Sequence, residues 1–169
     1  MFENDPGRKD RNLVGRRHLR NILSLVQVSR EVYLVWLGKS SEESYWTLVT
    51  KNGRLRPLSK DLQQKLSELT QTENEPKVQS LILQGQVCKL LITSIDSHKK
   101  ERKASVLYLS PNADLLATKE YQPVIENNGN VNHVLMNQRG RILCVCVQKS
   151  AESSNPKEWT VDQQPWSKP

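Results

Sequence analysis

Apolar residues are concentrated in the middle of the chain, and the short run with the highest apolar density is Ile142–Val147. On a strand, successive side chains point to opposite faces, so Ile142, Cys144 and Cys146 share one face and residues 143, 145 and 147 share the other. Both faces are apolar, which predicts a central strand covered on both sides. A turn at Gly140 precedes this run, so we expect a hairpin over Val131–Gln148.

Further runs rich in β-branched and aromatic residues lie between short turn signals. Asn52-Gly53 is a strong hairpin signal within Tyr45–Pro57, and Ser110–Asp114 is a turn by its proline and asparagine. The link Ile95–Arg102 is interpreted as a basic loop or a basic hairpin tip. Other strands are expected at Glu31–Leu37, Val78–Leu83, Val87–Ser94, Ala104–Leu109 and Leu115–Thr118.

Two segments have the apolar spacing of amphipathic helices. The first, Arg16–Gln27, carries a stripe at i, i+3, i+4 and i+7 that consists of Leu19, Ile22, Leu23 and Val26. The second, residues 59–69, has Ser59 as a plausible N-cap and leucines at 62, 66 and 69. The expected fold class is therefore α+β, with a largely antiparallel sheet of six to eight strands, about two helices packed on it, and extended polar tails at both ends. The expected core includes Leu19, Leu23, Val35, Leu66, Ile82, Leu90, Ile92, Val106, Leu143 and Val145.

The 169 residues suit one domain with tails. Residues 1–15 are polar and contain Pro6 and Gly7, which indicates a basic mobile arm. We expect a single α+β domain over 16–149 and a C-terminal tail over 150–169 that contains prolines and tryptophans.

The formal net charge of +7 favours an anionic partner, either RNA or an acidic surface within a larger protein assembly. Basic residues cluster before and within the first predicted helix and again in the 95–102 link. An ordinary solvated face is the alternative interpretation of the same charges. The candidate anion-binding residues are Arg11, Arg16, Arg17, Arg20, Lys99, Lys100 and Arg102.

The tail contains Trp159 and Trp166, two of the four tryptophans. Tryptophan is costly to leave in water and is typical of binding hot spots. The rings could cover the protein's own sheet or fill pockets on a partner chain. We favour the partner slightly, because the tail gives the two rings no obvious apolar neighbour beyond Val161, and a tail that packs on its own sheet would usually carry more.

No sequence signature of a catalytic site is present, and we predict no catalytic residue, no cofactor and no metal ligand set. The chain lacks the motifs of serine hydrolases, P-loop enzymes, zinc proteases and dinucleotide-binding folds. Cys88, Cys144 and Cys146 each lie in an apolar run and are expected to be reduced core residues. His133 is the one histidine in an apolar strand context, where a core or sheet-edge position is the favoured interpretation.

The sequence also lacks an apolar run of the roughly 18 residues needed for a membrane helix. Its polar N-terminus lacks the apolar core of a signal peptide. Together with the sparse cysteines, these features predict a cytoplasmic protein without a membrane span.

A mixed antiparallel sheet with a flanking helix resembles the small-molecule sensor folds of the PAS, GAF and profilin-like types. The segment Asn137–Leu143, NQRGRIL, looks like a hairpin common in such domains. The resemblance implies an enclosed ligand pocket with convergent polar groups. The leading prediction is nevertheless a non-catalytic accessory protein that docks on an anionic partner, and the alternative is a ligand sensor or an enzyme.

Overall fold

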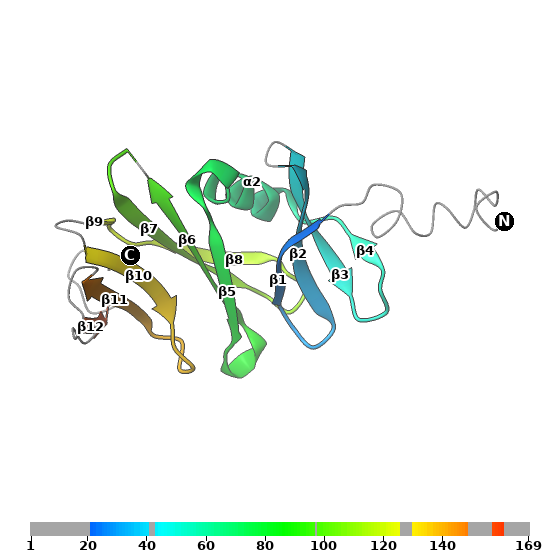
Figure 1. The fold of residues 1–169 in the computed structure, drawn as a ribbon. Helices are drawn as coiled ribbons and strands as arrows, with labels where there is room; N and C mark the ends of the chain where they lie inside the picture. Colours follow the sequence, from blue (N-terminus) through cyan, green and yellow to red (C-terminus); the bar gives the residue numbers. More distant parts are fainter. Residues whose placement is uncertain (1–20, 41–42, 97, 126–129, 149–156, 161–169) are drawn as a thin grey trace.

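Antiparallel strands form most of the computed structural model, which describes residues 21–40, 43–96, 98–125, 130–148 and 157–160. The strands form three sheets, A, B and C (Figure 1). Sheet A has the order β1-β2-β3-β4 and sheet C the order β10-β11-β12. Sheet B has the order β5-β6-β7-β8, and β9 pairs with β7. The strands are β1 (Asn21–Gln27), β2 (Val32–Ser40), β3 (Glu43–Thr50), β4 (Leu55–Arg56), β5 (Lys77–Ile82), β6 (Cys88–Asp96), β7 (Glu101–Leu109), β8 (Leu115–Glu120), β9 (Val124–Ile125), β10 (Asn130–Met136), β11 (Ile142–Gln148) and β12 (Lys157–Thr160).

The α+β expectation is wrong, because the described residues contain one α-helix, α2 (Lys60–Leu69), and three sheets rather than two helices on one sheet. Single 3-10 turns lie at Thr72–Asn74 and Gln84–Gln86. The helix α2 begins as predicted, since the Ser59 side chain accepts a hydrogen bond from Leu62 N at 3.3 Å.

The described part of the first predicted helix is a strand, β1. It pairs with β2 through a tight turn in which Val28 N–H donates to Val32 O. Burial follows a period of two near the end of β1, with Val26 and Val28 buried and the residues between and before them exposed. Tertiary pairing of β-branched residues therefore prevailed over a helical spacing of only four positions.

Sheet B is the central layer. Cys88, Leu90 and Ile92 of β6 pack with residues of sheet A and with Leu62 and Leu66 of α2. The opposite face of sheet B packs against sheet C, through a cluster made of Leu91, Ala104, Val106, Tyr121, Val134, Met136, Ile142 and Cys144. The strand covered on both faces is thus β6, where residues 88–93 are all buried.

The predicted hairpin at residues 131–148 is present, but its second strand is not the central one. On β11, Ile142 and Cys144 are buried against sheet B, whereas Leu143 and Val145 are half-buried on the other face. Two expected core residues are wrong, because Leu23 is 44% exposed and Ile82 is 39% exposed at sheet edges. Leu143 and Val145 are only half-buried, and Leu19 lies outside the described residues. The remaining five expected core residues are buried, namely Val35, Leu66, Leu90, Ile92 and Val106.

Part of the C-terminal tail belongs to sheet C. Lys157–Thr160 forms β12, which pairs with β11 in a register that places Trp159 opposite Cys144. Trp166 lies outside the described residues. The described part of the chain also contains no helix with the length and apolarity required to cross a membrane.

Candidate functional site

The turns of five hairpins lie at one end of the molecule, which we call the hairpin end. These turns are residues 28–31, 51–54, 83–87, 110–114 and 137–141. Contacts join neighbouring turns across the sheets. Lys51 N–H donates to Glu31 O at 2.7 Å within sheet A, and the side chain of Leu83 in sheet B packs over Gly140 in sheet C. Figure 1 shows this end along the lower edge of the view.

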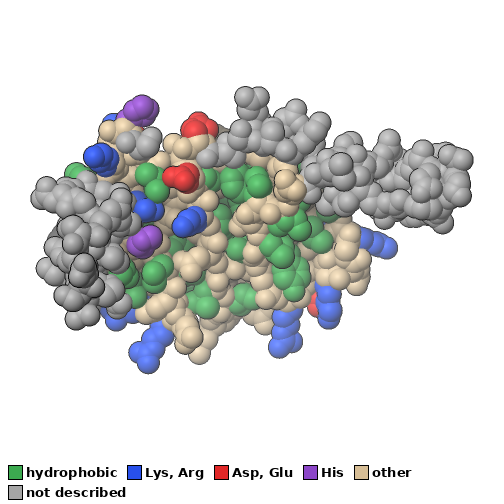
Figure 2. All heavy atoms as spheres, in the orientation of Figure 1, with side chains coloured by type: hydrophobic (Ala, Val, Ile, Leu, Met, Phe, Trp, Pro, Cys, Tyr) green, Lys and Arg blue, Asp and Glu red, His purple; other side chains and the backbone are tan. Residues whose placement is uncertain are grey.

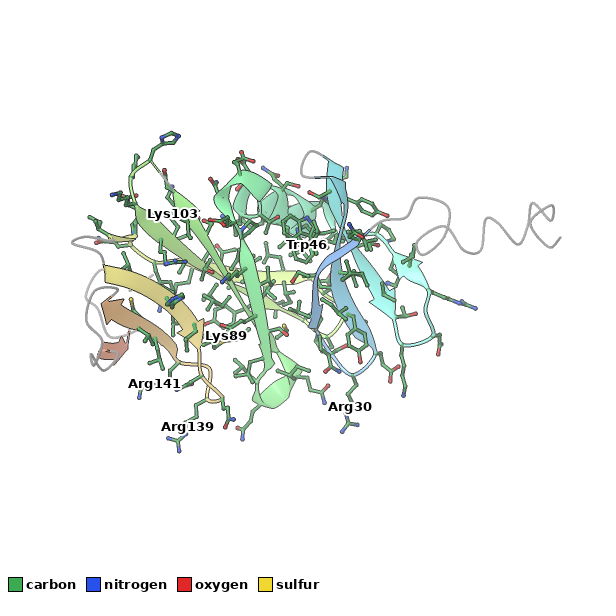
Figure 3. The ribbon with its side chains drawn as sticks, in the orientation of Figure 1. Arg30, Trp46, Lys89, Lys103, Arg139 and Arg141 are labelled. Atoms are coloured by element: carbon green, nitrogen blue, oxygen red, sulfur yellow. The ribbon has the colours of Figure 1, made fainter. Side chains whose placement is uncertain are left out.

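Five exposed cations project from these turns, which we call the hairpin-end cations. They are Arg30, Lys51, Arg54, Arg139 and Arg141. Lys and Arg side chains gather along the lower margin in Figure 2, and in Figure 3 the labelled arginines point away from the sheets. The same five turns contain two acids, Glu31 and Asp114. None of the five cations pairs with a carboxylate of the described residues.

The turn that carries Arg139 and Arg141 is held by its own hydrogen bonds. The Asn137 side-chain oxygen accepts from the backbone N–H groups of both arginines, each at 2.9 Å. Gly140 N–H donates to Asn137 O at 3.0 Å, and Gly140 has a φ of 83°, a conformation that favours glycine. The backbone of both arginines is therefore fixed before any partner arrives, so binding need only order their side chains.

Lys89 fastens this turn to the central sheet. Its side chain is buried on β6, and its Nζ donates to Gly140 O at 2.5 Å, between the two arginines in sequence. The same ammonium lies 5.9 Å from the centre of the Tyr108 ring. A charge-assisted hydrogen bond from a buried lysine is stronger than a neutral one, so sheet B sets the position of the Arg139–Arg141 turn.

The predicted cations that the structure describes lie elsewhere, at the opposite end of β6 and β7. Lys99 and Lys100 are exposed in the β6–β7 turn, and Arg102 is half-buried and pairs with Val124 of β9. The Asp96 carboxylate accepts from the backbone N–H groups of His98 and Lys99. The backbone hydrogen bond from Lys99, the one from His98 and the nearby charges of Lys99 and Lys103 hold the pKa of Asp96 below its usual range. Arg11, Arg16, Arg17 and Arg20 lie outside the described residues.

The structure thus brings Lys99, Lys100 and Arg102 together on one hairpin, but away from the hairpin end. Sequence reasoning missed the hairpin-end cations because they are scattered from residue 30 to residue 141. One signal could have found them: Lys51, Arg54, Arg139 and Arg141 all flank the turn glycines Gly53 and Gly140.

A groove of about 510 Å³ lies between β1, β5 and β10, above residues of β6. His133 is exposed on its β10 side, and no carboxylate of the described residues lines the groove. A histidine beside a carboxylate would favour an enzyme or a ligand sensor, but the described lining of this groove does not contain such a pair. The lining residues are Leu23, Ser24, Pro76, Lys77, Val78, Gln79, Leu91, Thr93, His133, Val134 and Leu135.

Two of the cysteines, Cys88 and Cys144, are buried, as expected of core residues. Burial raises the pKa of Cys88 to about 11, and Cys144 is fully buried between sheets B and C. Among the described residues no group of three or more His, Cys, Asp or Glu side chains is placed to hold a metal ion.

Comparison with known proteins identifies no relative. No protein-family model matches the chain, and neither the curated proteins nor the solved structures include a significant match.

Proposed function

We propose that this chain is a non-catalytic accessory protein that docks on an anionic macromolecule, and that this partner is RNA. The observation that carries the proposal is the convergence of the hairpin-end cations from two sheets onto one end of the molecule. The net charge of +7 supports it, because such a charge raises the encounter rate with polyanions.

The chemistry of the hairpin end suits phosphates rather than bases. Arginine presents a planar fork of donors that matches a phosphate, and four of the five hairpin-end cations are arginines. Reading single-stranded bases relies on stacking onto aromatic rings. The five turns contain no aromatic residue. We therefore expect the protein to contact the sugar–phosphate backbone with little preference for sequence.

The residues first considered from sequence keep a secondary place in this proposal. Lys99, Lys100 and Arg102 offer a smaller basic surface at the other end, beside the acids Asp96 and Glu101. The basic residues of the N-terminal arm and the two tail tryptophans are proposed as further contacts to the partner. A cytoplasmic location agrees with RNA as the partner and is proposed with it.

Fluorescence anisotropy with a labelled single-stranded RNA at low salt tests the proposal. The double substitution R139E/R141E should weaken binding by at least about tenfold, because each reversed charge adds repulsion to the lost phosphate contact. The matched control K99E/K100E reverses the same amount of charge at the opposite end and should weaken binding by much less.

Two results would contradict the proposal in different ways. Equal losses in the two double variants would remove the hairpin end as the binding surface. If the unsubstituted chain does not bind RNA at low salt, RNA is excluded as the partner, and an acidic surface of a protein assembly is the partner to test next.

A further inference from the structure

No described strand pairs with the outer edge of β10, and this edge directs backbone groups toward the groove beside it. Asn137 N–H donates to Arg141 O at 3.0 Å, so this pair is hydrogen-bonded. In an antiparallel ladder, hydrogen-bonded pairs alternate with pairs whose N–H and C=O groups point away from the partner strand. Counting back along β10 from Asn137, the backbone N–H and C=O groups of Met136 and Val134 point away from β11.

A bond from β10 to β5 supports this count. Met136 N–H donates to the side-chain oxygen of Gln79 on β5, at 3.1 Å. The Gln79 side chain thus takes the place that a strand carbonyl would occupy at one position of the edge. Two residues further back, the N–H and C=O of Val134 face the groove that Val134 lines.

The groove lies where edges of all three sheets meet. β1 is an edge of sheet A, β5 of sheet B and β10 of sheet C, and β5 lies between the other two in Figure 1. The same alternation applies to β5. Leu83 N–H donates to Val87 O, so this pair is hydrogen-bonded, and counting back along β5 shows that the backbone groups of Val78 point away from β6. No backbone ladder joins these three edges in the described part of the chain.

The side chains of the groove combine apolar surface with hydrogen-bond donors and the positive charge of Lys77. Leu23, which is 44% exposed, and Leu135 supply apolar surface from β1 and β10. Lys77 and His133 are exposed on opposite sides of the groove, and none of its lining residues is acidic. The volume of about 510 Å³ falls in the range of sites that enclose ligands.

We propose that this groove binds an extended acidic peptide segment of a partner protein, which adds as a strand to the free edge of β10. Backbone bonds to the edge supply affinity, and alternate side chains of the added strand supply specificity. His133 and Leu135 share one face of β10, so the carboxylates of an alternating segment lie on that face beside His133, and its apolar side chains lie on the face of Val134. The positive charge of Lys77, which also lines the groove, attracts the same carboxylates. This site is separate from the hairpin-end cations and does not depend on the proposed RNA binding.

The test uses a blocked peptide of about eight residues that alternates valine and aspartate, a length typical of a single strand. Amide NMR of the full chain should show shifts at β10 and β5 on titration. Hydrogen exchange of the Val134 amide should slow by about tenfold or more, since the added strand accepts its hydrogen bond. A matched peptide that alternates valine and lysine should bind much more weakly.

Two variants test separately the contribution of the Lys77 charge and that of the backbone edge of β10 to peptide binding. Lys77→Glu should weaken the valine–aspartate peptide by at least about fivefold, whereas the control Lys60→Glu on α2 should leave binding unchanged. Val134→Pro removes an edge N–H without removing a ladder bond, and should abolish peptide binding. If Val134→Pro unfolds the chain, Lys77→Glu still decides. Unchanged β10 amides at about 1 mM peptide, or equal binding by Lys77→Glu and the unsubstituted chain, would overturn the proposal.

Discussion

The side chain of Thr70, at the C-terminal end of α2, connects this helix to sheet A through hydrogen bonds of its hydroxyl group. The Thr70 Oγ1 accepts from Trp46 Nε1 at 2.9 Å and donates to Leu66 O at 2.5 Å. Trp46 also stacks on Trp36, with ring centroids 5.5 Å apart and planes 6° from parallel. All of these groups are buried.

The substitution Thr70→Val keeps the shape of the side chain and removes the hydroxyl. Leu66 O retains a partner, because the backbone N–H of residue 70 donates to it at 2.9 Å. The indole N–H of Trp46 loses its acceptor at a buried site, and an unsatisfied buried donor costs about 1–3 kcal/mol. We expect Thr70→Val to lower the free energy of unfolding by about 2 kcal/mol.

A double-mutant cycle tests the assignment of this cost to the indole. In a Trp46→Phe background no donor is left unsatisfied, so adding Thr70→Val should cost only about 0–1 kcal/mol. Urea unfolding followed by far-UV circular dichroism measures all four proteins. If Thr70→Val costs the same in both backgrounds to within about 0.5 kcal/mol, the reasoning is refuted.

Three further predictions concern single sites. Gly140→Ala should destabilise the fold by about 1–2 kcal/mol, because φ is 83° and an added Cβ would lie 3.3 Å from Leu83; unchanged urea unfolding would contradict this. Because burial raises the Cys88 pKa to about 11, the stability contributed by its protonated thiol should be complete below about pH 8.5 and lost as pH rises toward 11. Iodoacetamide should therefore modify native Cys88 slowly at pH 9, as peptide mass spectrometry can show. The lowered pKa of Asp96 means that its support of the β6–β7 turn is present above about pH 4 and lost as pH falls further. Faster hydrogen exchange of the Lys99 amide on acidification, corrected for intrinsic rates, would show that loss, and Asp96→Asn should abolish the change.

Local signals in the sequence were sufficient for the hairpins and for α2. Gly53 and Gly140 both have positive φ in the turns where they were expected, because few other residues adopt that conformation without strain. The Ser59 cap was likewise a local feature, since its acceptor and donor are three residues apart.

Pairing between distant segments was not predictable in the same way. The 16–27 segment had a helical spacing, but its described residues pair with β2, and that choice depends on a partner strand rather than on its own period. Two-sided cover was assigned to residues 142–147, whereas β6 has it, because only the stacking of three sheets decides which apolar strand is central.

The candidate sites show the same division. Lys99, Lys100 and Arg102 are close in sequence and were found as a cluster. The hairpin-end cations meet only because five antiparallel hairpins turn at one end, and Lys89 holds one of those turns through Gly140 O. The hydrogen bond from Lys89 has no signature in the linear chain, and the convergence has only one, the position of four of the cations beside the turn glycines Gly53 and Gly140.

The salt dependence of RNA binding tests the central claim most directly. Each phosphate contact to a single strand contributes about −0.7 to the slope of log K against log salt, so the five hairpin-end cations contribute about −3.5 to that slope. The neutral double variant R139Q/R141Q should reduce the steepness by about 1.4. A slope in that variant equal to that of the unsubstituted chain would contradict the assignment of the hairpin end as the phosphate-binding surface.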